Sequence, residues 1–461
     1  MHRHLFIDGW RHAVALPIVR GIKAGAIALT LFFALSVSAS AATDVAALRQ
    51  KAEQGDAAAQ YGLCVAYDKG KGLAQDDRQA FEWCHKAAKQ GDTKAQTLLG
   101  KFYENGLGSA QDKAKAVYWY QKAAEQGFSL AQAVLGDRYY YGESIAQDYV
   151  KAVYWYQKAA EQGFTSSQYN LGLLYGYGKG VINKEKSVYW LRKAAEQENS
   201  LAQASLGWRY YTGEGVAQDK SQAFYWFQKA AEQGHAKAQY NIGFMYHNGE
   251  AVPKDDVRAL EWFQKAAGQG LAEAQHTLGG MYFYGLGVAR DYAQAAQWLH
   301  KAAEQGLAES QFNMGMMYCY GRGVDKDYAQ AAQWWRKAAE QGNAAAQRGL
   351  GALYALGQGL ERDYGQAATW WGKAAGQGEA KAQYGLGMLY ALGKGVAQDS
   401  RLAAEWLGRS AAQGDEDAAK ALQLLQQEGI EALVEKYNTV TVTLFEGDII
   451  FGKGIRIITP K

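Results

Sequence analysis

The 461-residue sequence contains little proline and little cysteine, with three residues of each. Glycine, in contrast, is abundant at 54 residues, and aromatic residues make up 13% of the chain. Flexible linkers lack such aromatic content, and collagen needs a strict glycine period with abundant proline. The composition therefore predicts packed, aromatic-rich elements separated by many turns. Three cysteines are too few for a disulfide framework, and no Cys-x-x-Cys motif is present.

Net charge is also nearly absent. The formal charge is +3, and residues 1–41 account for all of it, because the rest of the chain has 45 basic and 45 acidic residues. Proteins that bind nucleic acid through its phosphates carry a clear basic excess. We therefore expect no nucleic-acid partner.

Motifs for catalysis and for metal binding are missing as well. The sequence has no phosphate-binding G-x-x-x-x-G-K-[ST], no G-x-S-x-G, no S-x-x-K and no H-E-x-x-H. The histidines after residue 41 are scattered and show no metal-ligand spacing. We accordingly predict no catalytic residue, no metal ligand and no cofactor.

Residues 1–41 have the features of a secretory signal peptide. Basic residues precede an uncharged run from Ala24 to Thr43, and the segment Ala39-Ser40-Ala41 matches a signal-peptidase site. We expect cleavage after Ala41, a periplasmic or secreted location and no stable membrane insertion thereafter. The competing interpretation is an uncleaved anchor, because 20 uncharged residues are just enough to span a bilayer.

A Lys-Ala-Ala-Glu-Gln-Gly-like string recurs along the chain every 36 residues, with one spacing of 35. These strings divide residues 56–414 into ten units. Self-similarity at this period indicates a solenoid of stacked supersecondary units.

Each unit is predicted to form two helices. In the unit 199–234, Leu206 and Tyr210 share one face of the first helix, with Gly207 beside Leu206 as a close-packing point. A glycine-rich turn follows, and Asp219 stands where it would cap the second helix. We expect the tryptophan that recurs in the second helix to be a core residue; it is Trp83, Trp119, Trp155, Trp190, Trp226, Trp262, Trp298, Trp334, Trp370 and Trp406.

The repeat consensus reads AQxxLGxxYxxGxGVxxDxxxAxxWxxKAAEQG. This pattern resembles the Sel1-like repeat family, a relative of the tetratricopeptide repeats. The resemblance implies an all-α fold, a right-handed α-α superhelical solenoid of ten helix-turn-helix repeats. It also implies that one side of the first helices lines a concave groove that binds peptides or proteins. Cysteine-rich relatives are associated with β-lactam binding or hydrolysis, but this chain lacks their repeated cysteine pairs, so that activity is not expected.

The two ends of the array differ from the repeats. Residues 42–55 are predicted to form an N-terminal capping helix and residues 415–438 a C-terminal capping helix, which solenoids need. Residues 439–461 alternate with period two and are rich in Thr, Val and Ile, which predicts a short β-hairpin-like tail. That tail either docks on the last helices, which we favour, or adds an edge strand to the sheet of a partner.

One stripe of the first helix varies between units, whereas the buried columns barely do. This stripe holds aromatic side chains, which are suited to partner binding because they offer rigid contact area. The alternative is that these rings only pack between adjacent units. The candidate groove residues are Tyr140, Tyr169, Trp208, Tyr211, Tyr240, Phe244, His276, Phe283 and Phe312.

Cys64 and Cys84 lie on the two helices of the first unit, about equally far from the turn. An antiparallel hairpin could bring them together in a disulfide, but the interpretation that we favour is two small core residues without a bond. Cys319 has no evident partner.

Together these features favour an exported, non-catalytic scaffold or adaptor of the bacterial cell envelope that binds a protein or peptide. An envelope enzyme, or a protein that binds cell-wall glycan or β-lactam, is the alternative from another class. A structural role in envelope assembly cannot be separated from the first by sequence.

Overall fold

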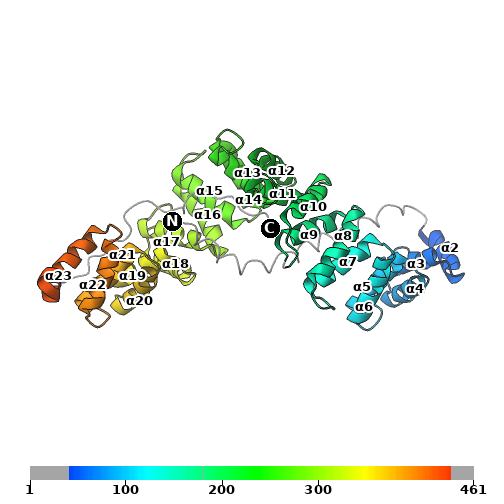
Figure 1. The fold of residues 1–461 in the computed structure, drawn as a ribbon, viewed down its shortest axis with the longest axis horizontal. Helices are drawn as coiled ribbons and strands as arrows, with labels where there is room; N and C mark the ends of the chain where they lie inside the picture. The colour runs from blue at the N-terminus through cyan, green and yellow to red at the C-terminus, as the bar shows by residue number, and fades with distance from the viewer. Residues whose placement is uncertain (1–40, 179, 438–461) are drawn as a thin grey trace. The chain divides into compact units, whose positions relative to one another are not determined.

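The computed structural model describes residues 41–178 and 180–437. These residues form 22 helices and no strand, and they divide into two compact units that meet between Gln233 and Gly234 (Figure 1). The predicted all-α solenoid of ten helix pairs is thereby confirmed. The predicted tail, 439–461, and the predicted signal peptide, apart from Ala41, lie outside the described residues.

The first unit consists of one leading helix, α2 (Ala41–Glu53), and five helix pairs. The first helices of these pairs are α3 (Ala57–Lys69), α5 (Thr93–Asn105), α7 (Ser129–Tyr141), α9 (Thr165–Tyr177) and α11 (Ser200–Thr212). Their second helices are α4 (Asp77–Lys89), α6 (Lys113–Glu125), α8 (Tyr149–Glu161), α10 (Lys184–Glu196) and α12 (Lys220–Glu232).

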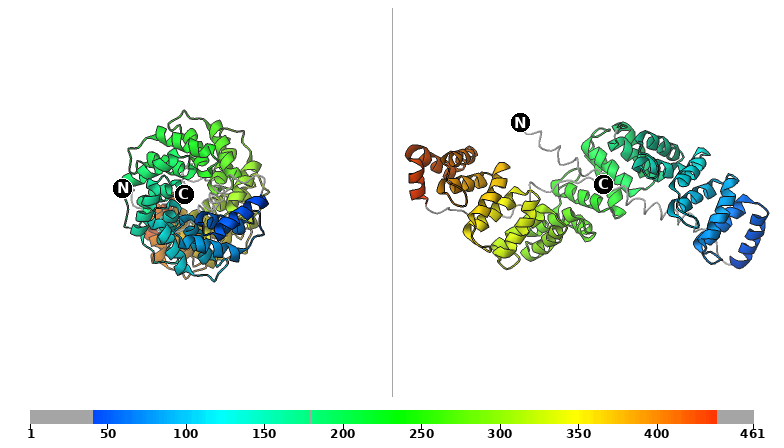
Figure 2. Two further views of the ribbon diagram at one scale, coloured as in Figure 1. Left: turned by 90° about the vertical axis from the view of Figure 1, so that its right-hand side faces the viewer. Right: turned by 90° about the horizontal axis from the view of Figure 1, so that it is seen from below.

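The second unit consists of five further pairs and a terminal helix, α23 (Glu416–Lys436), which bends at Gly429. Its first helices are α13 (Ala236–Asn248), α15 (Ala272–Tyr284), α17 (Ala308–Tyr320), α19 (Ala344–Leu356) and α21 (Ala380–Leu392). Its second helices are α14 (Asp256–Gly268), α16 (Tyr292–Glu304), α18 (Tyr328–Glu340), α20 (Tyr364–Gly376) and α22 (Ser400–Ala411). Within each unit every helix packs against the helices before and after it in the chain (Figure 2).

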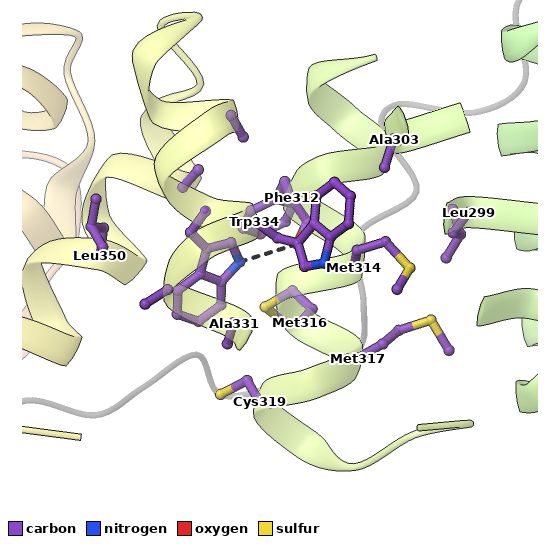
Figure 3. Packing of buried hydrophobic residues seen from close by; sticks show 14 of the residues in the cluster. Leu299, Ala303, Phe312, Met314, Met316, Met317, Cys319, Ala331, Trp334 and Leu350 are labelled. Atoms are coloured by element: carbon purple, nitrogen blue, oxygen red, sulfur yellow. Dashed lines mark hydrogen bonds between the residues drawn. The ribbon is translucent and has the colours of Figure 1, made fainter. Parts of the chain in front are cut away.

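A glycine in the first helix lets the two helices of a pair approach closely. A Cβ atom on Gly136 would lie 2.6 Å from the ring of Tyr156, and one on Gly315 would lie 2.3 Å from the ring of Trp335. Any side chain at these positions would therefore push the second helix away. The second-helix residue in contact with the glycine is almost completely buried, as Trp335 is. Figure 3 shows Phe312, Met316 and Met317 of the core cluster to which Trp335 belongs.

The recurrent tryptophan stands one position before this buried column, and the prediction that it is core holds only in part. Trp190, Trp334 and Trp370 are buried, whereas the other seven are partly buried, five of them packed against core clusters. A basic side chain three residues further on covers the ring in several repeats, as Lys265 does at 3.9 Å from the Trp262 ring centroid. Such a ring packs with one side and forms a cation–π contact with the other.

A buried glutamine joins each repeat to the helix before it. Gln132 of α7 donates from Nε2 to the carbonyl oxygen of Ala124 in α6, at 3.0 Å. Its Oε1 accepts a hydrogen bond of 2.8 Å from Gln162, which follows α8 of the same repeat. The same pair of bonds is made by Gln60, Gln96, Gln168, Gln203, Gln275, Gln311, Gln347 and Gln383.

The turn between the two helices of a repeat also requires glycine. A Cβ on Gly108 would lie 2.2 Å from the carbonyl oxygen of Asp77, and the φ of Gly108 is +68°. Ser144 and Ala251 stand at the equivalent place and keep positive φ values of 69° and 60°. The turns of these two repeats thus retain the glycine conformation at a steric cost.

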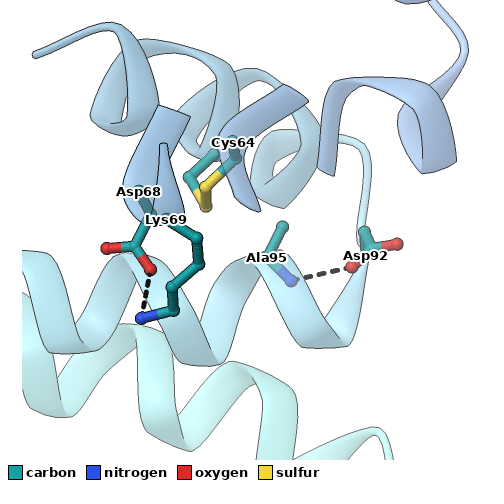
Figure 4. Close-up of a disulfide and its surroundings, with 6 residues drawn as sticks. Cys64, Asp68, Lys69, Asp92 and Ala95 are labelled. Carbon is teal, nitrogen blue, oxygen red and sulfur yellow. Dashed lines mark hydrogen bonds and ion pairs between the residues drawn. A yellow bond between two sulfur atoms is a disulfide. The ribbon is translucent and has the colours of Figure 1, made fainter. Parts of the chain in front are cut away.

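The first repeat replaces the glycine–ring contact by a covalent bond. Cys64 takes the place of the glycine and Cys84 the place of the ring, and the two form a disulfide with a Cα–Cα distance of 5.1 Å (Figure 4). Both cysteines are fully buried. Of the two interpretations that the sequence left open, the structure contains the disulfide.

Replacing the disulfide by the glycine and aromatic residue found at these positions in other repeats should make the stability of the first repeat insensitive to reduction. We expect dithiothreitol to destabilise the natural first repeat by about 3 kcal/mol, because the bond closes a short loop. The double variant Cys64→Gly, Cys84→Tyr should show no such response, since Gly136 and Tyr156 pack without a covalent link. The stability of the first repeat is measured by the hydrogen-exchange protection of α3 and α4 with and without reductant. Equal protection of the natural protein in both conditions would contradict it.

His235 caps helix α13 through a ring nitrogen. Its Nδ1 accepts a hydrogen bond of 3.1 Å from the backbone N–H of Ala238. Burial, and then the nearby charge of Lys237, lower the pKa of His235 from 6.5 to about 4. A protonated imidazole cannot accept this bond, so the cap requires the neutral ring.

The His235 cap predicts acid sensitivity of the second unit. Because the folded-state pKa is depressed, the stabilisation is present above about pH 6.5 and is lost as the pH falls towards about 4. His235→Asn should keep the cap, as Asn343 does for α19, and lose less stability between these pH values. Thermal melting followed by circular dichroism measures this, with His300→Asn at a half-exposed site as the control. Identical pH profiles for His235→Asn and the natural protein would refute the assignment.

Candidate interaction surface

The nine predicted groove residues all lie on first helices. They are Tyr140 on α7, Tyr169 on α9, Trp208 and Tyr211 on α11, Tyr240 and Phe244 on α13, His276 and Phe283 on α15, and Phe312 on α17. None of them is among the exposed side chains.

Four of the nine are core residues, which corrects the prediction that they are free for a partner. Tyr240, Phe244, Phe283 and Phe312 expose only 3–7% of their surface. The ring of Tyr240 packs on Phe263 at 5.1 Å, and that of Phe312 on Trp335 at 6.4 Å. These rings fill the space between neighbouring helices, as the alternative interpretation had it, and offer little area to a partner.

His276 joins two neighbouring first helices. Its Nδ1 lies 2.8 Å from the hydroxyl oxygen of Ser310, on α17. Burial lowers the pKa of His276 to about 4, so the ring is neutral at pH 7. The residue therefore holds α15 to α17 rather than facing a ligand.

Tyr169 is half-buried and packs against the core cluster that includes Val188, Leu191 and Leu206. Burial raises the pKa of its hydroxyl to about 12. Tyr169 thus also contributes mainly to packing.

The remaining three residues are partly buried and lie on α7 and α11 of the first unit; we call Tyr140, Trp208 and Tyr211 the first-helix surface. The rings of Trp208 and Tyr211 stack with centroids 6.2 Å apart. Tyr140 forms edge-on contacts with Tyr141 and Tyr149. In the second unit the equivalent positions hold buried residues such as Met316 and Cys319 on α17 and Ala352 and Ala355 on α19.

Paired charges fix the first helices next to this surface. Arg138 of α7 lies 2.9 Å from Glu104 of α5 and also pairs with Glu143. Arg209 of α11 is only 1% exposed and pairs with Glu214. Breaking a buried pair leaves an uncompensated charge, so the pair between Arg138 and Glu104 constrains how α7 aligns on α5.

Asp137 lies among these groups and is also largely desolvated. Tyr156 donates a hydrogen bond of 2.5 Å to its carboxylate, but burial outweighs this bond and raises the pKa of Asp137 to about 6. A carboxyl group with a raised pKa can serve as a general acid or base. Asp137 is bonded to Tyr156 and lies close to the charges of Arg138 and Glu143, which makes it part of a structural network.

Across the described residues no group of three His, Cys, Asp or Glu side chains has the geometry to hold a metal ion. Two shallow pockets lie near the ends of the described chain, one of about 460 Å³ beside Lys381 and Asp415 and one of about 400 Å³ beside Arg49 and Leu73. Neither includes the first-helix surface. None of the described helices combines the length and apolarity that crossing a membrane requires.

Comparison with known proteins identifies the family. The Sel1 repeat model matches ten consecutive segments, 57–92, 93–128, 129–164, 165–199, 200–235, 236–271, 272–307, 308–343, 344–379 and 380–415. The chain belongs to the Sel1 repeat family. Sel1 repeats generally mediate protein interactions. No curated protein matches the sequence.

Two solved structures of Sel1 repeat proteins resemble the chain over most of their length. One is c5321, described as a protective antigen present in uropathogenic Escherichia coli strains and displaying an SLR fold. It is 36% identical with a TM-score of 0.73, and the match covers 92% of this chain and 95% of c5321. The other is a Sel1 repeat protein from Oxalobacter formigenes, 34% identical with a TM-score of 0.57, where the match covers 68% of this chain and 91% of that protein.

Sequence reasoning missed an exposed column on the second helices of Sel1 repeats two to five. Tyr118, Tyr154, Tyr189 and Tyr225 each expose about half of their surface. Each directly precedes the recurrent tryptophan, where the other repeats have Glu82, Glu261, Gln297, Gln333, Thr369 and Glu405. Comparing the repeats at this position would have found the column, because packing there tolerates a polar residue.

Proposed function

We propose that this Sel1 repeat protein is a non-catalytic scaffold of the bacterial cell envelope that binds a protein or peptide through its first-helix surface. The stacked pair Trp208 and Tyr211 is the observation that carries the proposal. Half-exposed aromatic side chains on a rigid helix lose little entropy when a partner covers them, which is why such residues dominate binding energy at interfaces.

The contrast between repeats supports this assignment. Repeat nine has Ala352 and Ala355 where repeat five has Trp208 and Tyr211. The Sel1 packing therefore does not require aromatic residues at these two positions. Their presence in repeat five is explained by contact with a partner.

Two observations support an exported location. Residues 1–41 have the features of a signal peptide, and the first repeat uses a disulfide where the other repeats pack a glycine against an aromatic ring or a leucine. Disulfides persist in the periplasm and outside the cell and are rare in the cytosol. The likeness to c5321, a protective antigen, is in keeping with such a location.

No side-chain arrangement among the described residues favours the alternative of an envelope enzyme or a binder of cell-wall glycan or β-lactam. The proposed partner is a protein or peptide, with no nucleic acid involved. No cofactor is part of the proposal.

Removing the aromatic pair should weaken partner capture without unfolding the protein. We expect Trp208→Ala with Tyr211→Ala to reduce recovery of a crosslinked envelope partner about tenfold or more, a loss typical of a hot spot. Helicity should be unchanged, since repeat nine has alanine at both positions. Quantitative mass spectrometry of crosslinked complexes measures the effect.

The matched control is Val257→Ala, which truncates a side chain that is 55% exposed on α14 of the second unit. It should leave capture unchanged. If the double variant captures the same partner as strongly as the control, the first-helix surface is not the binding site.

A further inference from the structure

The four exposed tyrosines of repeats two to five form two parallel rows together with lysines. Tyr118, Tyr154, Tyr189 and Tyr225 occupy the same position on α6, α8, α10 and α12 (Figure 1). Four residues further on, one helical turn away, stand Lys122, Lys158, Lys193 and Lys229, all exposed. All eight side chains belong to the first unit. We call these two rows the tyrosine–lysine strip.

The tyrosines are not needed for packing. Six of the ten repeats have Glu, Gln or Thr at this position and form the same helix pair. Each tyrosine leans edge-on against the following tryptophan, as Tyr154 does on Trp155 at 4.9 Å. This contact holds the ring in place while about half of its surface stays exposed.

The strip is basic as well as aromatic. Helices α6, α8, α10 and α12 together carry eleven Lys or Arg and five Asp or Glu. Helices α14, α16, α18 and α20 carry six and four. The net positive charge is thus concentrated on the helices that also expose tyrosine, so the complementary partner is acidic.

The lysines determine which part of each tyrosine a partner can reach. In three of the four repeats the ammonium group lies over the tyrosine ring, for instance Lys158 at 5.1 Å from the ring centroid of Tyr154. In repeats without the tyrosine, the equivalent lysine lies over the tryptophan instead, as Lys301 does at 4.1 Å from Trp298. A cation therefore occupies one face of the tyrosine ring in three repeats, and in all four repeats the tyrosine also contacts the following tryptophan.

A sugar or a nucleic-acid base binds aromatic residues by stacking on a free ring face. The cation on one face of Tyr118, Tyr154 and Tyr225 competes with that mode. What remains accessible is the ring edge, the phenolic hydroxyl and the ammonium group, which suit a chain with carboxylates and apolar side chains. Carboxylates pair with lysine, and apolar side chains cover the ring edges.

We propose that the tyrosine–lysine strip binds an acidic, extended segment of a partner protein that carries apolar side chains between its carboxylates. The linear arrangement over four successive repeats fits an extended segment. The strip lies on second helices and includes none of the residues of the first-helix surface, so it is a second binding site and does not depend on the proposed function.

A selection experiment tests this proposal. A random linear peptide library displayed on phage is selected against the purified full-length protein. We expect enrichment of peptides that combine Asp or Glu with apolar residues, and a fall of their affinity with rising salt, because exposed charge pairs are screened. Fluorescence anisotropy of the enriched peptides measures the affinity.

The decisive variant carries Tyr118→Gln, Tyr154→Gln, Tyr189→Gln and Tyr225→Gln. Repeats seven and eight have Gln297 and Gln333 at this position, so the variant should fold normally. We expect it to bind the enriched peptides at least about tenfold more weakly. Gln297→Ala with Gln333→Ala is the matched control and should bind as the natural protein does.

Three outcomes would overturn the proposal: no enrichment of acidic peptides, equal binding by the quadruple variant, or binding that is indifferent to salt. Binding of an acidic polysaccharide such as polygalacturonate, lost in the quadruple variant while no peptide binds, would overturn it in favour of a glycan. Trp208→Ala with Tyr211→Ala should leave peptide binding intact. An experiment that contradicts the tyrosine–lysine strip can therefore be told apart from one that contradicts the first-helix surface.

Discussion

The contact between a first-helix glycine and one buried second-helix side chain is the constraint on which every repeat but the first depends. The side chain opposite the glycine is Tyr156 in one repeat, Leu191 in the next and Trp335 in another. The backbone of the first helix, which has no side chain at that point, accommodates all of these. Because interiors are close-packed, a larger residue at the glycine would separate the helices and expose both buried faces.

A second constraint operates between repeats. Each buried glutamine uses both ends of its amide, donating to the preceding helix and accepting from the end of its own repeat. Leaving a buried amide group unpaired costs about 1–3 kcal/mol, so the bond pattern fixes the alignment of each repeat on the previous one. Hydrophobic burial alone would not fix that alignment, because apolar contacts are not directional.

The sequence was sufficient to predict the helix pairs, the capping aspartates and the close-packed glycines, because these features recur at a fixed period and each has a local physical cause. It was not sufficient to predict burial of the variable first-helix stripe. Tyr240 and Phe312 are one position away from the buried face, and their burial depends on the distance between neighbouring first helices. That distance depends on how the repeats pack on one another, and the period of the sequence does not determine it.

The burial of the recurrent tryptophan was predicted only in part, for a related reason. A large aromatic residue that recurs in every repeat suggests a core position. The structure instead buries the following column completely and leaves seven tryptophans partly buried, of which Trp83, Trp262 and Trp298 lie beneath a lysine. A ring that is part of a cation–π contact satisfies helix packing and solvent exposure at the same time. The large size of a side chain therefore did not distinguish a fully buried core residue from one that packs with one face and is covered by a basic side chain on the other.

Freedom from packing is a better guide to function in this fold than aromatic content. Two positions of the repeat accept either a large aromatic residue or a small or polar one, and the helix pair stays the same. The first position holds Trp208 in repeat five and Ala352 in repeat nine. The second holds Tyr225 in repeat five and Gln297 in repeat seven. Repeats two to five place exposed or half-exposed aromatic residues at such positions, whereas the second unit mostly fills them with buried or polar residues. Both units form the same helix pairs, so the stability of the fold does not explain why the two units differ at these positions. The two binding surfaces that we propose on the first unit, one on its first helices and one on its second helices, would account for it.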